Sequence, residues 1–324
     1  MQKNNSFSEI FNLLILSGER IPAIYKWMTD SVWTEERFKS YETTKYYEEG
    51  EKQILKLEEL ILNTASGIYD ELASMSLSNF SILKELQDSK TALVIFDGMS
   101  LREIPLIKKL ARATGFSIEE ANYKYASLPS DTKSFIEQRI LGKSIAPSQL
   151  ESRKELKEIN IKSFYYDTPI RHFEIPSNGS SYLLWSSFPD GTYLDFEARN
   201  SHHFETLIKH FDVVWKNIIL AIPKDYRIII TSDHGYVYLN SGFETSEKGE
   251  VALSFLEQER FRFYDGSGAP LDVNELQIIS QKKLAMLRGR IKNRPKGHTS
   301  NKVFRHGGLS LMEMLTPWIE LKRN

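Results

Sequence analysis

The sequence predicts an α/β fold, in which a mostly parallel central sheet is flanked by helices and preceded by a helical N-terminal appendage. From Thr91 onward, short apolar segments such as "TALVIF" and "RIIIT" alternate with amphipathic helical segments. In a sheet with one solvent-exposed face, apolar and polar residues alternate along each strand. The apolar segments lack this alternation, so they are expected to be buried on both faces. Before Thr91, only helical periodicity is visible.

The bulk composition sets limits on the class of protein. At 324 residues the chain exceeds the usual size of one core, so we expect one large domain, residues 90–324, with a helical N-terminal region, residues 1–89. There is no cysteine, which excludes disulfides, thiolate metal sites and cysteine nucleophiles. A net charge of −1 gives no general attraction to nucleic acid or anionic lipid.

No membrane partner is expected. No apolar run approaches the ~18 residues that span a bilayer. The first residues, "MQKNNSFSEIFNLLIL", lack the small-residue cleavage site of a signal peptide. We therefore expect a cytoplasmic protein.

The N-terminal region is expected to contain helices at 7–16, 35–62 and 67–75, each with a charged outer face. Such helices suit docking to a protein partner. The alternative is an appendage that packs on the domain that follows.

The second region supplies the sheet and its helices. Strands are expected at 91–97, 117–125, 159–167, 181–188 and 227–232. Helices are expected at 102–115, 134–143, 202–222 and 311–319. This alternation predicts a mostly parallel sheet with both faces covered.

Acids and a histidine follow three of these strands. Asp97 follows the first, Asp190 follows "SYLLWSSFP", and Asp233 with His234 follows "RIIITS". Ligands of such sheets bind beyond the carboxyl ends of the strands, so we expect these side chains to meet at one edge. Adjacent Asp233 and His234 could both reach one metal ion, although a core histidine with one hydrogen bond is the common alternative.

Two of these motifs also have purely structural interpretations. Asp97-Gly98 is a frequent turn, and Pro189-Asp190-Gly191 reads well as a hairpin turn. Neither motif decides the function by itself.

Two further motifs carry possible chemistry. In "LPSDTK", Ser130, Asp131 or Thr132 can cap a helix, but a hydroxyl at a helix N-terminus also lies where an anion binds. In "FRHGGLS", the glycine pair lets the backbone pass close to a neighbour while His306 points inward. Lys133 would add positive charge.

Together, "FDGMS", "LPSDTK", "SDHGY" and "HGGLSLMEMLTPWI" resemble the alkaline phosphatase superfamily, and more closely its PglZ-domain branch. The resemblance covers roughly residues 90–320 and implies an alkaline-phosphatase-like fold. It also implies that Thr132 is the nucleophile and a metal bridge, with Lys133 beside it. Asp97, Asp233 and His234 would hold one divalent ion.

The second ion would take His306 and acids after the middle strand. Here the sequence departs from the family pattern, because Asp190 and Asp195 in "FPDGTYLDF" are one residue further apart than usual. We favour Asp190 with Asp195, and His203 as the substitute. Oxygen and nitrogen ligands favour zinc, with manganese as the alternative.

A basic segment bears on the substrate. Residues 282–305 carry nine lysines and arginines and no acid, and they lead into His306. A solvated loop is the usual explanation, but beside a phosphotransfer centre the segment would attract a polyanion. We therefore predict a two-metal phosphodiesterase acting on nucleotide or nucleic-acid phosphodiesters, since PglZ relatives occur in phage defence and bacterial signalling. The alternatives are a phosphomonoesterase or sulfatase-like hydrolase, and a non-catalytic partner in a defence or signalling assembly.

Overall fold

The computed structural model describes residues 19–78, 81–87, 90–167, 175–176, 179–192, 202–265, 273–293 and 303–324. The helix expected at 7–16 and the candidate ligand Asp195 lie outside the described residues. Within the described part of the chain, no helix is both long and apolar enough to cross a membrane.

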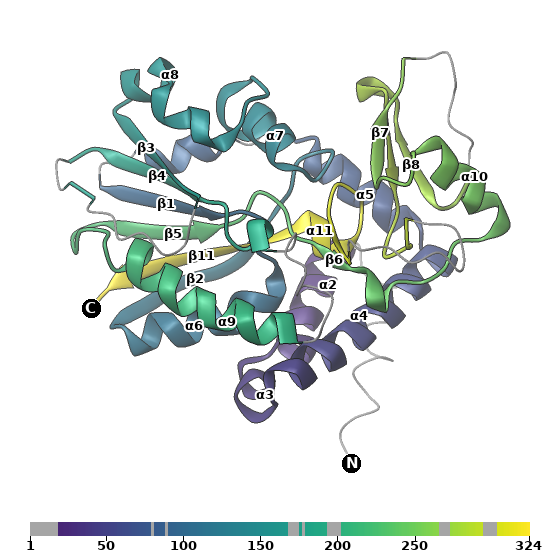
Figure 1. Ribbon diagram of the computed structural model, residues 1–324, viewed down its shortest axis with the longest axis horizontal. Coiled ribbons are helices and arrows are strands. Elements are labelled where there is room, and N and C mark those ends of the chain that lie inside the picture. The colour runs from purple at the N-terminus through teal and green to yellow at the C-terminus, as the bar shows by residue number, and fades with distance from the viewer. Residues whose placement is uncertain are drawn as a thin grey trace.

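A six-stranded sheet forms the centre of the molecule, in the order β2-β11-β5-β1-β4-β3 (Figure 1). Its strands are β1 Thr91–Phe96, β2 Phe116–Tyr125, β3 Ile161–Tyr166, β4 Ser181–Ser186, β5 Arg227–Thr231 and β11 Leu315–Arg323. Strands β3, β4, β1 and β5 pair in parallel, and β11 runs antiparallel to both of its neighbours. The predicted α/β fold with a mostly parallel sheet is confirmed.

Alternate residues of β1 enter two different cores, because successive side chains of a strand point to opposite faces. Ala92, Val94 and Phe96 join the larger core, whereas Leu93 and Ile95 join the smaller one. Helices α6 and α9 cover the first face, and α7 and α8 cover the second (Figure 1). Burial on both faces explains why these strands read as continuous apolar runs.

Helices α6, α7 and α9 lie close to where the sequence predicts them, whereas α8 was not predicted. The covering helices are α6 Ile104–Ala113, α7 Thr132–Phe135, α8 Lys154–Glu158 and α9 His202–Val214. Single π-helical turns, Ile136–Leu141 and Trp215–Ile219, continue α7 and α9.

The N-terminal helices share the larger core with the sheet. They are α2 Arg20–Trp27, α3 Glu35–Ser40, α4 Thr43–Thr64 and α5 Gly67–Ser76. On α4, Tyr47 stacks on Phe204 of α9 with ring centroids 4.0 Å apart. These helices therefore bury apolar surface against the domain that carries the site.

The prediction of a helix at 311–319 is wrong. Helix α11 covers only Leu311–Met314, and the chain then becomes β11. Pro317 has no backbone N–H and disfavours helix in the residue before it. Between β2 and β5, the segment pairs its backbone on both sides instead.

The segment between β5 and β11 carries two smaller sheets. Its elements are β6 Val237–Tyr238, α10 Glu247–Phe255, β7 Phe261–Phe263, β8 Leu276–Ile279, β9 Leu284–Leu287 and β10 Phe304–Arg305. Strands β7, β9 and β8 form an antiparallel sheet, and β10 pairs with β6. This β10 pairing brings the residues that follow it back to the edge of the main sheet.

Candidate active site

Polar residues converge beyond the carboxyl ends of three neighbouring parallel strands. Asp97 follows β1, Asp233 and His234 follow β5, and Asp190 follows β4. The Asp190 N–H donates to the Asp97 carbonyl at 2.9 Å, which ties the ends of β4 and β1 together. Parallel pairing with β1 on both sides places these residues at the same edge.

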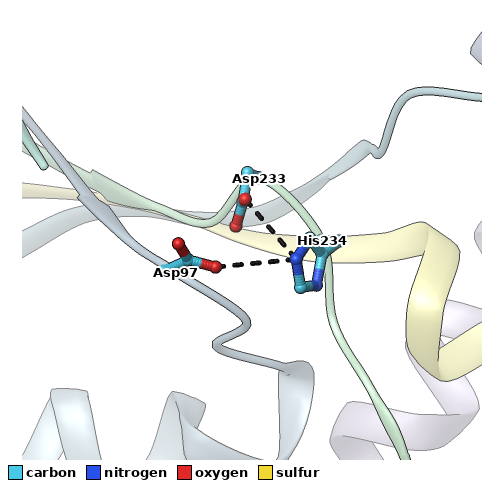
Figure 2. Close-up of side chains that lie close together, drawn as sticks. All are labelled: Asp97, Asp233 and His234. Carbon is cyan, nitrogen blue, oxygen red and sulfur yellow. Dashed lines mark ion pairs between the residues drawn. The ribbon is translucent and has the colours of Figure 1, made fainter. Parts of the chain in front are cut away.

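Asp97, Asp233 and His234 form a group that could hold a metal ion, with their ligand atoms within 4.8 Å of one another (Figure 2). His234 Nε2 lies 3.5 Å from Asp97 Oδ1 and 3.5 Å from Asp233 Oδ2. The His234 Nδ1 lies 2.9 Å from the Gly235 carbonyl. Because a carbonyl only accepts, Nδ1 carries the proton and Nε2 is left as the ligand atom.

Thr132 meets this group from the opposite side. Its Oγ1 donates to Asp233 Oδ2 at 2.6 Å and lies 3.3 Å from Asp97 Oδ1. Asp131 is the residue that caps α7, because its Oδ1 accepts from the Ser134 N–H at 2.7 Å. The Thr132 hydroxyl is thereby left free to face the carboxylates. Lys133 is exposed at the next helical position.

His306 and Asp190 lie beside the first group. The His306 ring stacks on that of His234, with centroids 4.0 Å apart and an interplanar angle of 15°. His306 Nε2 is 3.9 Å from Asp190 Oδ1. The structure therefore brings Asp97, Thr132, Asp233, His234, Asp190 and His306 to one place.

The alternative ligand His203 has different surroundings. It is 5% exposed, and its ring centroid lies 4.8 Å from that of Phe304. It belongs to an aromatic cluster with Phe204 and Tyr238. Asp195, expected beside Asp190, is not described.

The electrostatics of the group fit a divalent cation. Asp97 is buried, and burial together with Asp233 and Asp190 raises the pKa of Asp97 well above its usual value. In the part of the chain that the structure describes, no lysine or arginine pairs with these three carboxylates. Burial opposes the charging of His234, yet Asp233 and Asp190 raise the pKa of its imidazole. Neutralising buried acids that have no protein cation is what a bound metal would do.

Two contacts of the site have no counterpart in the sequence motifs. Trp185 on β4 donates its indole N–H to Asp97 Oδ2 at 3.3 Å. The Gly98 N–H donates to Asp233 Oδ1 at 3.1 Å. Trp185 reads as an ordinary apolar strand residue, so only its position beside β1 reveals this role.

Of the six cations of the basic segment that the structure describes, four pair with acids from elsewhere in the chain. The ion pairs are Arg288–Asp70, Arg290–Glu51, Lys292–Glu244 and Arg305–Glu259. Arg294, Lys296 and Lys302 lie outside the described residues. The charge run in the sequence therefore overstates the free positive charge near His306.

Comparison with known protein families gives a match over part of the chain. Residues 196–321 match the family described as the BREX system PglZ alkaline phosphatase-like domain. This part of the chain is thus similar to that family, as its motifs indicate. The match covers Asp233, His234 and His306, whereas Asp97, Thr132 and Asp190 precede it.

Two other comparisons add little. No curated protein matches the chain. Among solved structures, murine ectonucleotide pyrophosphatase/phosphodiesterase 5, an inactive form in complex with AMP, is similar with a TM-score of 0.39 and 12% identity. The alignment covers 71% of this chain and 87% of that chain. Nothing about the site follows from so distant a likeness.

Proposed function

We propose that this protein is a metal-dependent phosphodiesterase in which Thr132 is the nucleophile. The observation that carries the proposal is the convergence of the Thr132 hydroxyl on Asp97 and Asp233 at the sheet edge. A threonine with a purely structural role would not need two buried carboxylates around its hydroxyl. The match to an alkaline phosphatase-like domain supports a phosphoester as the substrate class.

Two ions are proposed, zinc or manganese. Asp97, Asp233 and His234 would hold the first ion, with Asp190 and His306 at the second. When bound, they would act as Lewis acids that favour the Thr132 alkoxide and neutralise the phosphate oxygens.

The chain's own residues account for the proton movements. Thr132 Oγ would bond to phosphorus as the bond to the leaving oxygen breaks, and its proton would pass to Asp233 Oδ2, 2.6 Å away. The leaving alkoxide would take a proton from solvent. Water would then bond to phosphorus and release one proton to solvent. As the Thr132–phosphorus bond breaks, Asp233 would return its proton to Thr132.

A nucleotide or nucleic-acid diester is the proposed substrate, and the N-terminal helices are the proposed contact with a partner in a BREX-type defence assembly. Similarity to the PglZ family supports the defence context. The proposed substrate class rests mainly on the centre, because Arg288, Arg290, Lys292 and Arg305 of the basic segment are paired with acids.

The test uses the full chain loaded with zinc or manganese. Hydrolysis of bis-nitrophenyl phosphate is compared with that of nitrophenyl phosphate, and a faster diester reaction is expected. Thr132→Ala should lower kcat/KM by about a thousand-fold or more, and should abolish the phosphothreonine that mass spectrometry detects after rapid quenching. Ser134→Ala, on the same helix, is the control.

Each other outcome has a definite meaning. Full activity in Thr132→Ala would remove the threonine from the mechanism. A wild-type chain that binds metal but hydrolyses neither ester would favour the non-catalytic alternative. Faster hydrolysis of the monoester would favour a phosphomonoesterase.

A further inference from the structure

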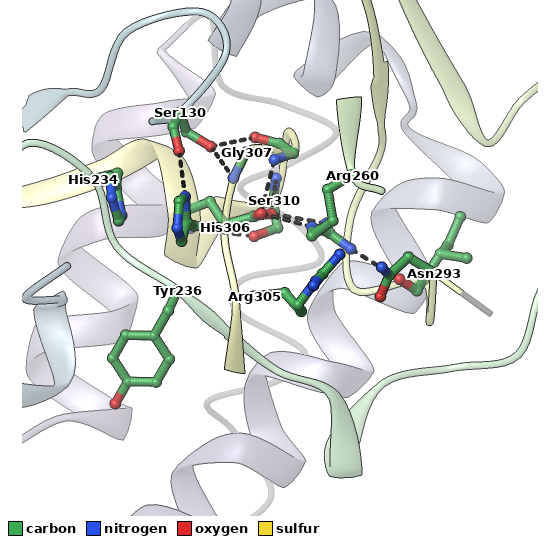
Figure 3. Close-up of polar contacts among 12 residues, drawn as sticks. Ser130, His234, Tyr236, Arg260, Asn293, Arg305, His306, Gly307 and Ser310 are labelled. Atoms are coloured by element: carbon green, nitrogen blue, oxygen red, sulfur yellow. Dashed lines mark hydrogen bonds and ion pairs between the residues drawn. The ribbon is translucent and has the colours of Figure 1, made fainter. Parts of the chain in front are cut away.

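Ser130 joins the loop that carries Thr132 to the segment after β10 that carries His306, Gly307 and Gly308 (Figure 3). It is fully buried, two residues before Thr132. Its Oγ donates to the Gly308 carbonyl at 2.8 Å and accepts from the Gly307 N–H at 3.1 Å. One hydroxyl therefore satisfies a donor and an acceptor of the facing backbone.

The main chain of Ser130 also selects the nitrogen that His306 presents. His306 Nδ1 lies 3.3 Å from the Ser130 carbonyl. Because that oxygen can only accept, Nδ1 holds the proton, and the lone pair is left on Nε2. Nε2 is the atom that lies 3.9 Å from Asp190 Oδ1. The stack on His234 fixes the plane of the ring.

The glycines explain how this segment comes so close to Ser130. Gly307 has φ +103°, and a Cβ there would lie 2.5 Å from the Phe261 ring. A Cβ on Gly308 would lie 2.6 Å from the Arg260 guanidinium. Only residues without a side chain fit between Ser130 on one side and Arg260 on the other.

The other side of the segment that contains Gly307 and Gly308 is held by Arg260 and Glu313, independently of the loop that carries Thr132. Glu313 accepts from the Gly308 N–H at 2.8 Å. Arg260 donates to both oxygens of Glu313, at 2.6 and 2.8 Å. This buried pair fixes the segment against α11, but it makes no link to Thr132. Ser130 provides that link.

We propose that Ser130 is a positioning residue that holds His306 Nε2 toward Asp190 and fixes the second metal site relative to Thr132. The inference rests on the proposed function, because it assumes that Asp190 and His306 bind the second ion. It adds a role for a residue that touches neither ion nor substrate. Loss of a partner that orients a ligating histidine typically weakens metal affinity about 10- to 100-fold.

Ser130→Ala is the variant that tests this role, and Ser127→Ala is its matched control. Ser127 is equally buried in the same loop. Its Oγ lies 2.9 Å from the Pro129 carbonyl and 3.3 Å from the Asp131 carbonyl, and in the described hydrogen bonds it makes no contact with the His306 segment. Should Ser130→Ala fail to fold, Ser130→Cys keeps the size of the side chain with a much weaker donor.

Two measurements are made on each variant. The first is the tautomer of His306 in metal-free protein, from long-range ¹⁵N–¹H NMR of the imidazole, assigned with His306→Ala. The second is a titration with zinc. Wild type and Ser127→Ala should show the Nδ1–H tautomer and two ions. Ser130→Ala keeps the carbonyl that faces His306 Nδ1 but loses the hydroxyl bonds to Gly307 and Gly308 that hold the two segments together. The contact between Nδ1 and the carbonyl should therefore loosen, giving mixed tautomers, an unchanged first ion, and a second ion bound about 10- to 100-fold more weakly.

The two proposals fail in different ways. A second-ion affinity in Ser130→Ala within about two-fold of wild type, with the tautomer retained, would overturn the role of Ser130. A wild-type chain that binds only one ion would overturn the second metal site. In that case, the metal-free tautomer would still decide whether Ser130 positions His306.

Discussion

Glu58 links the N-terminal helices to the site, and it should make stability depend on pH. It lies in the middle of α4 with 0% exposure, and its Oε1 accepts from the Leu311 N–H at 2.5 Å. Burial raises the pKa of Glu58 to about 7, against the opposing effects of Arg290 and the Leu311 N–H. Leu311 begins α11, directly after the His306 segment.

The size of the effect follows from the pKa difference. The ordinary value is 4.5, so the shift is about 2.5 units, and at about 1.36 kcal/mol per unit it corresponds to about 3 kcal/mol. Between these two values the folded state holds a proton that the unfolded chain has released. The contribution of Glu58 to the free energy of unfolding is therefore largest below pH 4.5 and is lost as the pH rises through 7.

Glu58→Gln should remove this dependence. Glutamine keeps the oxygen that accepts from Leu311 but carries no charge. The variant should match wild type near pH 4.5 and exceed it by up to about 3 kcal/mol at pH 8. Urea unfolding followed by circular dichroism, repeated across this range, measures the difference. Glu59→Gln, an exposed neighbour, is the control. Parallel stability curves for Glu58→Gln and wild type would refute the reasoning.

Three further predictions concern the site and its support. Asp190→Asn should lose the second ion and keep the first in a zinc titration; two retained ions would exclude Asp190 as a ligand. Arg260→Met leaves Glu313 charged and buried without its partner, and should lower the free energy of unfolding by about 3–5 kcal/mol in urea; a loss below about 1 kcal/mol would contradict a structural role. Gly235→Ala would place a Cβ 2.0 Å from the Met312 carbonyl, so the melting temperature and the first-ion affinity should both fall, and unchanged values would contradict so close an approach.

Much of the fold could be predicted from sequence because buried strands show a simple pattern of apolar residues. Strands β1 and β5 are covered on both faces, so their residues are apolar throughout. The polar residues that interrupt these runs, Asp97 and Asp233, mark the strand ends. Strand β11 was missed because its pairing with β2 and β5 depends on partners far away in the chain.

The support around the site could not be predicted in this way. The sequence offered Ser130, Asp131 and Thr132 as equal candidates for the helix cap. In the structure Asp131 caps the helix, and Ser130 bonds to the backbone of Gly307 and Gly308. Thr132 contacts the carboxylates. Each assignment depends on the direction of a side chain at a loop, which local propensity does not fix.

The sequence by itself determined the class of fold, the strand ends and the identities of the acids, histidines and threonine that carry chemistry. Local burial and residue type suffice for those, because each is a property of a short segment. Only the tertiary structure decided that His306 stacks on His234 and that the basic segment is paired with Asp70, Glu51, Glu244 and Glu259. Contacts between segments far apart in the chain are set by strand order and packing, which no single segment encodes.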